Sequence, residues 1–243
     1  MLLQWAAGGL FFGWMTARHG LLGLGYSWLL RICYGTLALL GFAVGVRFDW
    51  LPGRDLPALA VGLITVVLFV GSFRHRTRGV SLDPRFELAA PVVGAVGLVA
   101  AGINAGDPAW LSVARMLVGA AFLGVVSDAM LLGHWYLVQP GLSRSPLIEL
   151  IRWAGALWLP EVVLFLVPTG MISVWTGTID DGYAGMLGWF WGACAVSTIG
   201  LVITTLAALR EKQYAAVMAA TGLLYLAILT GFGIDLVARA TLS

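Results

Sequence analysis

Eight long apolar windows follow one another along the chain, each bounded by charged residues or by Gly and Pro. An apolar stretch of about 20 residues crosses the hydrocarbon core of a bilayer as a helix. Inside hydrocarbon, only helices and closed barrels satisfy the polar groups of their own backbone. The sequence therefore predicts an all-α integral membrane protein, a polytopic bundle of about eight transmembrane helices. The windows are 2–17, 22–46, 56–73, 88–103, 110–138, 150–175, 183–209 and 214–238.

The first and fourth windows are short for a perpendicular crossing, so six or seven crossings also fit the pattern. Hydrophobic residues make up 60% of the chain and charged residues 11%, whereas soluble domains average about 45–50% and about 25%. The 243 residues leave no room for a sizeable soluble domain beside the crossings. We therefore expect one transmembrane helical domain over residues 1–243, with the lipid bilayer as its surroundings.

The charge of the chain argues against nucleic acid as a partner. The net charge is only +2, and the basic residues are spread among the turns, without the patch that nucleic-acid binding requires. Cys33 and Cys194 each lie alone inside an apolar window, which is typical of small buried side chains and not of a disulfide or zinc site. We expect no metal site and no nucleic-acid partner.

Basic residues in short loops favour the cytoplasmic side of a membrane. The turn at 74–85 holds the strongest basic cluster, with four arginines and His75, and is expected inside. Counting the windows alternately then puts Arg18, the 144–152 hairpin and the 210–212 turn inside as well, and the acidic turn at 180–181 outside. The pattern predicts both termini outside and a multi-pass location in a cell membrane of the bacterial inner-membrane type.

Glu161 lies within a stretch that is otherwise free of charge, 157–167. Ionisable residues inside a membrane are costly and mark proton, ion or ligand paths. Asp128 and Arg31 lie in other windows, and all three are roughly nine to eleven residues from the expected cytoplasmic ends, or about 14 to 17 Å deep. They are the predicted proton or ion path, in which Arg31 neutralises one acid. The alternative is an ion pair that only fixes helix register.

Two prolines accompany Glu161 in the sixth window. Pro160 and Pro168 each remove a backbone donor, so the helix should bend or break there. Asp235, near the outer end of the last window, is interpreted as an anchor at the membrane interface.

His134 closes the fifth window and is followed by Trp135 and Tyr136. One imidazole or phenol donor beside an apolar wall suits a quinone head. Alternatively, His134 and His19 would ligate the iron of one b-type haem, with Arg18 pairing with a propionate. These five residues are the predicted cofactor site, and the alternative for each histidine is an interfacial side chain with a wet tip.

Three functions follow from these patterns. The first is a membrane subunit of a respiratory or photosynthetic electron-transfer complex that holds or borders a quinone or b-type haem near the cytoplasmic face, together with other membrane subunits. The second is a proton- or cation-coupled secondary transporter or channel that uses Asp128 and Glu161. The third is a structural or assembly subunit without chemistry of its own. Nucleotide-binding, metalloprotease and nucleophile-elbow motifs are absent from the sequence, so no catalytic residue is predicted and enzymatic activity stays open.

Overall fold

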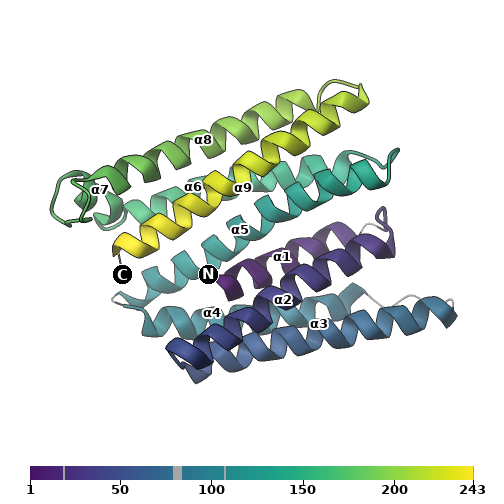
Figure 1. The fold of residues 1–243 in the computed structure, drawn as a ribbon, viewed down its shortest axis with the longest axis horizontal. Helices are drawn as coiled ribbons and strands as arrows, with labels where there is room; N and C mark the ends of the chain where they lie inside the picture. Colours follow the sequence, from purple (N-terminus) through teal and green to yellow (C-terminus); the bar gives the residue numbers. More distant parts are fainter. Residues whose placement is uncertain (19, 79–83, 107, 243) are drawn as a thin grey trace. The chain divides into compact units, whose positions relative to one another are not determined.

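The computed structural model describes residues 1–243 except 19, 79–83, 107 and 243, and except the side chains of 75–78 and 84. All regular structure in this part of the chain is helical (Figure 1). The helices are α1 (Leu2–Ala17), α2 (Leu24–Phe48), α3 (Pro52–Arg78), the 3₁₀ helix η1 (Pro84–Leu88), α4 (Ala89–Asn104), α5 (Ala109–Val138), α6 (Ser145–Leu166), α7 (Gly170–Trp175), α8 (Met186–Ala208) and α9 (Tyr214–Leu242).

Six helical segments among the described residues are long and apolar enough to cross a membrane. They are Leu24–Phe48, Pro52–Arg74, Arg85–Asn104, Ala109–Val138, Met186–Ala208 and Tyr214–Leu242. The chain is thus an all-helical protein of the multi-pass membrane type. The other two predicted crossings fall short of this standard, because α1 has only 16 residues and α6 includes Glu149, Arg152 and Glu161.

The sixth window differs most from its predicted form. Its helix begins at Ser145, five residues before the predicted start, because Pro146 is compatible with the first turn of a helix. It runs through Pro160 and ends at Leu166, and the short helix α7 follows after residues 167–169. A bend or break was expected at both prolines, but the helix is continuous through Pro160 and ends before Pro168, so the 150–175 window forms two helices.

The chain forms two compact units, Met1–Gly124 and Val125–Ser243, and α5 contributes to both. In the first unit, α1 and α3 each pack against both α2 and α4, which closes a ring of four helices. Its interior contains the buried aromatic rings of Tyr26 and Tyr34. The first half of α5 lies against α1, where the Gln4 side chain donates to the Met116 carbonyl at 3.1 Å.

The contact between α1 and α5 is a backbone contact. A Cβ added to Gly8 would lie 1.7 Å from the Ala120 carbonyl oxygen, and one added to Gly124 would lie 2.2 Å from the Gly8 carbonyl carbon. Small residues let membrane helices approach this closely, and packing holds them together in place of a hydrophobic driving force. No larger residue fits at either position without moving a helix.

In the second unit, α8 packs along α9 and also contacts α6, and α7 contacts α6, α8 and α9. The Arg144 guanidinium donates to the carbonyl oxygens of Glu211, of Lys212 at 2.8 Å and of Gln213 at 2.9 Å. The α5–α6 and α8–α9 turns therefore lie at the same end of this unit, as the charge pattern predicts for this pair. The opposite end, where α6 and α9 finish and α7 lies, is called the α7 end below.

Candidate functional site

Arg31 belongs to the first unit, where it is 6% exposed. Its guanidinium donates to Glu87 Oε1 at 2.7 Å and to Ser72 Oγ at 2.8 Å. Its acidic partner is thus Glu87 of η1, whereas Asp128 and Glu161 both belong to the second unit. One cation faces one carboxylate here, so this pair is balanced in charge. Arg31 thus has an acidic partner within its own unit.

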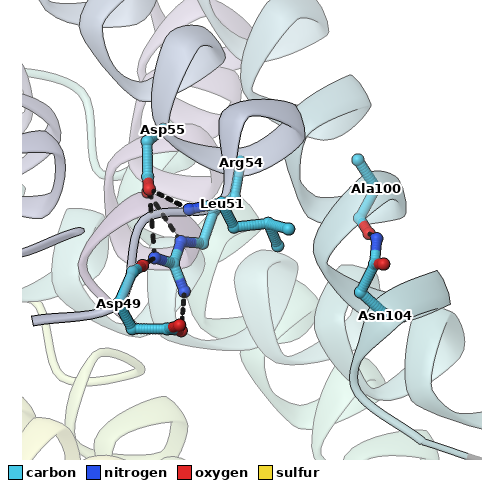
Figure 2. A network of polar contacts seen from close by, with 6 residues as sticks. All are labelled: Asp49, Leu51, Arg54, Asp55, Ala100 and Asn104. Atoms are coloured by element: carbon cyan, nitrogen blue, oxygen red, sulfur yellow. Dashed lines mark hydrogen bonds and ion pairs between the residues drawn. The ribbon is translucent and has the colours of Figure 1, made fainter. Parts of the chain in front are cut away.

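A second polar network of the first unit lies at the start of α3 (Figure 2). Asp55, 1% exposed, accepts the backbone N–H of Leu51 at 2.8 Å and the Arg54 Nε–H at 2.7 Å. An acid that reaches back to the residue before the helix satisfies one of the free donors of the first turn. Gly45 of α2 leaves room for this carboxylate, since a Cβ there would lie 2.3 Å from Asp55 Oδ1. The network is a helix cap.

The structure describes four of the five predicted cofactor residues, Arg18 in the first unit and His134, Trp135 and Tyr136 in the second. Arg18 stacks on Trp14 in the first unit, with its guanidinium carbon 5.8 Å from the ring centre, and His19 lies outside the described residues. In the second unit, His134 is exposed, and its Nδ1 lies 3.4 Å from the Tyr225 hydroxyl of α9. Among the described residues, the polar group beside this imidazole is therefore a phenol.

The two aromatic neighbours of His134 are engaged locally. The Trp135 indole donates to Gln139 Oε1 at 3.2 Å. The Tyr136 hydroxyl donates to the Ser143 carbonyl in the α5–α6 turn, and the Tyr136 carbonyl accepts the Tyr214 hydroxyl at 3.3 Å. Tyr136 thus fastens the turn end of the unit, and its donor is used there.

Asp128 and Glu161 are both fully buried in the second unit, but they lie at different levels. Asp128 is ten residues before the end of α5 at Val138, and Glu161 is sixteen residues after the start of α6 at Ser145. At 1.5 Å per residue, they lie about 15 Å and about 24 Å from the turn that joins these helices. The predicted common level is displaced because α6 begins earlier than its apolar window.

Glu161 instead lies beside Asp235 and Arg239 of α9, which act on it electrostatically. Glu161 and Asp235 are both fully buried. Arg239 Nε donates to both carboxylate oxygens of Asp235, at 2.8 and 2.9 Å. The guanidinium also lies over the ring of Phe165, one turn after Glu161, at 5.8 Å. A carboxyl pair and a single arginine thus meet between α6 and α9.

Charge balance distinguishes this cluster from the Arg31 pair. Two carboxylates face one guanidinium, and within the described residues no hydrogen-bond donor reaches either oxygen of Glu161. A buried carboxylate without donors is unstable in a low dielectric, and two adjacent acids resolve this by sharing a proton. A hydrogen bond between them forms only when one of them carries that proton. The arrangement is therefore suited to take up and release one proton.

The cluster lies close to the α7 end of the unit. Glu161 is five residues before the last residue of α6, and Asp235 is seven before the last residue of α9. Arg239 is 19% exposed and is the part of the cluster nearest to the surroundings.

Asp235 and Arg239 were not identified as site residues from the sequence. The interpretation of Asp235 as an interface anchor is wrong, because its side chain is fully buried. The available signal was the spacing of the two residues, since an acid and a base four apart lie on one helix face and pair. Such a pair near the end of one apolar window, together with an intramembrane glutamate in another window, would have indicated a contact between α6 and α9.

Within the described residues, no group of three or more His, Cys, Asp or Glu side chains is placed to hold a metal ion. No protein-family model matches the chain, and no curated protein or solved structure is significantly similar to it. The function therefore has to be inferred from the buried charges themselves.

Proposed function

We propose that this chain is a multi-pass membrane protein that moves protons, with the Glu161–Asp235 pair as its proton-binding site and Arg239 as the fixed positive charge. The observation that supports it is that, within the described part of the chain, two buried carboxylates face one arginine and no hydrogen-bond donor reaches either Glu161 oxygen. Such a pair exchanges one proton without leaving an uncompensated charge in the protein interior.

A proton fits this cluster better than a metal cation does. Arg239 Nε already occupies both oxygens of Asp235, which leaves the two Glu161 oxygens as free ligands. Calcium requires about six to eight oxygen ligands and magnesium about six. The transported or coupling species is accordingly the proton, either conducted alone or coupled to a second solute.

The proposal includes all eight long helices as crossings, with α1 and α6 added to the six apolar ones. A polar residue costs least in a crossing when it faces the protein interior, and Glu161 of α6 is buried in this way. Eight crossings place both termini on one side, which the basic turns assign to the outside of a bacterial inner-membrane type of cell membrane.

The test is proton flux through the full chain reconstituted in liposomes that contain a pH-sensitive dye. Glu161→Gln removes the exchangeable proton and should abolish the flux that a pH gradient and a potassium diffusion potential drive. Glu149→Gln, the same change near the other end of α6, serves as the matched control and should retain it. Equal flux in wild type and Glu161→Gln would contradict the proposal.

A second candidate function is kept because of the contact between His134 Nδ1 and the Tyr225 hydroxyl at 3.4 Å. Two hydrogen-bonding groups on an exposed helix surface in the membrane suit the carbonyl of a lipid-soluble quinone. This is the electron-transfer reading, in which the chain works beside other membrane subunits. It requires that the detergent-purified protein retain quinone and that Tyr225→Phe release it. Purified protein without quinone excludes this reading, and absence of both quinone and proton flux would leave the structural or assembly role.

A further inference from the structure

The buried layer around Glu161 contains a second unsatisfied polar group, on a different helix. Trp191 of α8 is 1% exposed, and within the described residues its indole Nε1–H has no hydrogen-bond acceptor. A buried donor without a partner costs about 1 to 3 kcal/mol, so each such group calls for an explanation. The Trp191 donor and the Glu161 acceptors are thus both buried without a hydrogen-bond partner among the described residues.

A contact between α6 and α8 fixes the level of Trp191 relative to the carboxyl pair. The Trp158 indole of α6 donates to the Ala195 carbonyl of α8 at 2.9 Å, and α6 and α8 run in opposite directions. Glu161 follows Trp158 by three residues of α6, a shift of about 4.5 Å along the helix axis. Trp191 precedes Ala195 by four residues of α8, a shift of about 6 Å in the same direction. Glu161 and Trp191 therefore lie within about one turn of each other.

The neighbouring helix pair gives the same level. A Cβ on Gly233 of α9 would lie 2.7 Å from the Cys194 sulfur of α8, so these residues are opposite each other. Three residues back from Cys194 is Trp191, and two residues on from Gly233 is Asp235. The indole, the carboxyl pair and the Arg239 guanidinium one turn further along form one buried layer of α6, α8 and α9.

We infer that the Trp191 indole and the Glu161 carboxyl share one small polar guest, a water molecule, through which the carboxyl pair exchanges its proton. This inference deepens the proposed function and rests on it. A buried water typically makes two to four hydrogen bonds to polar groups that otherwise lack partners. One indole donor and the Glu161 carboxyl supply two such partners, and the guest bonds to both at once.

The side of the layer also fits a role in proton entry. The Trp191 ring packs against Trp175, the last residue of α7, with ring centres 5.7 Å apart. The charged and titratable groups of the layer are Glu161, Asp235, Arg239 and the Cys194 thiol, and α7 contributes none. The indole thus contacts α7 and lies at the level of the carboxyl pair.

The experiment is difference infrared spectroscopy of the full chain in bilayers, with the carboxylic acid C=O band assigned by its loss in Glu161→Gln. Trp191→Phe keeps an aromatic ring and removes the donor, so the guest is held less firmly and the band should shift to higher wavenumber. Trp158→Phe removes an indole N–H from the same unit, but one that bonds to a backbone carbonyl, and should leave the band in place. An unchanged band in Trp191→Phe, or an equal shift in Trp158→Phe, overturns the inference.

If Trp191→Phe does not fold, a density map of the wild-type protein provides a second test. It should show an ordered peak within hydrogen-bond distance of both Trp191 Nε1 and the Glu161 carboxyl, and an empty gap or a direct bond between the two would overturn the inference. The outcomes are separable from those of the proposed function. Proton flux that depends on Glu161 together with an unchanged band refutes the shared guest alone, whereas loss of Glu161 dependence refutes the proton site itself.

Discussion

Removal of the Arg239 charge should destabilise the protein in a way that depends strongly on pH. Arg239→Met keeps most of the apolar length of the side chain but withdraws the cation that faces Asp235 and lies over Phe165. Asp235 is fully buried, and Arg239 Nε donates to both of its oxygens. Breaking a buried ion pair by removing one partner costs about 3 to 5 kcal/mol.

Protonation of Asp235 limits that cost and gives an independent estimate of it. An ordinary aspartate has a pKa of about 3.9, and each pH unit above that value costs about 1.4 kcal/mol to keep the acid neutral. At pH 7 the cost is therefore about 4 kcal/mol, within the range expected for the broken pair. At pH 5 it falls to about 1.5 kcal/mol, so acidification should restore much of the lost stability.

The assay is equilibrium unfolding in mixed micelles at pH 5, 6 and 7, with the free energy of unfolding extrapolated to the detergent without denaturant. Asp235→Asn combined with Arg239→Met removes both charges together and should recover most of the stability at pH 7. A loss that is equal at pH 5 and pH 7, or a double variant as unstable as Arg239→Met, would refute the assignment of Arg239 as the counter-charge.

Two further predictions concern parts of the molecule away from this cluster. Gly124→Ala places a methyl group against the α1 backbone and should lower the free energy of unfolding by about 1 to 3 kcal/mol through overpacking. Gly200→Ala, which meets open space, should change the free energy of unfolding by no more than about 0.5 kcal/mol in the same assay. Hydrogen bonds from the backbone N–H groups of Gly185, Tyr183 and Leu187 lower the pKa of Asp181. The Asp181 charge therefore stabilises the start of α8 fully above the ordinary aspartate pKa. This stabilisation is lost as the pH falls through the lowered pKa of Asp181. Asp181→Ala should accordingly speed amide hydrogen exchange at these three residues at neutral pH, and the difference from wild type should shrink in acid. Persistence of the full difference in acid, or the same effect in Asp180→Ala, would count against this role of the Asp181 carboxylate.

The sequence predicted those parts of the fold that the lipid surroundings determine. Lipid requires long apolar helices, so seven of the eight windows correspond to helices whose ends differ from the prediction by a few residues. The break at Pro168 and the shared end of the α5–α6 and α8–α9 turns also follow from local rules, the missing proline donor and the placement of basic residues. The early start of α6 does not follow from these rules, because residues 145–149 are polar enough to be predicted as a turn.

The partners of the buried charges could not be predicted in the same way. Arg31 pairs with Glu87 and Glu161 lies beside Asp235, and each pairing joins helices that are far apart in the chain. Depth along a helix can be counted from the sequence, but the face that a helix turns toward its neighbours depends on packing of the whole unit. Asp235 was misread for this reason, since its position near a helix end suits an interface anchor as well as a buried ion pair.

The most direct test of the proton site is whether the acid pair holds a proton at neutral pH. Infrared spectra of the protein in bilayers at pH 7, recorded in H2O and D2O, report a protonated carboxyl group through a C=O band that shifts on deuteration. The proposed site predicts such a band in wild type and its loss in Glu161→Gln. A band that is absent at pH 7, or that persists unchanged in Glu161→Gln, would contradict proton binding by the Glu161–Asp235 pair.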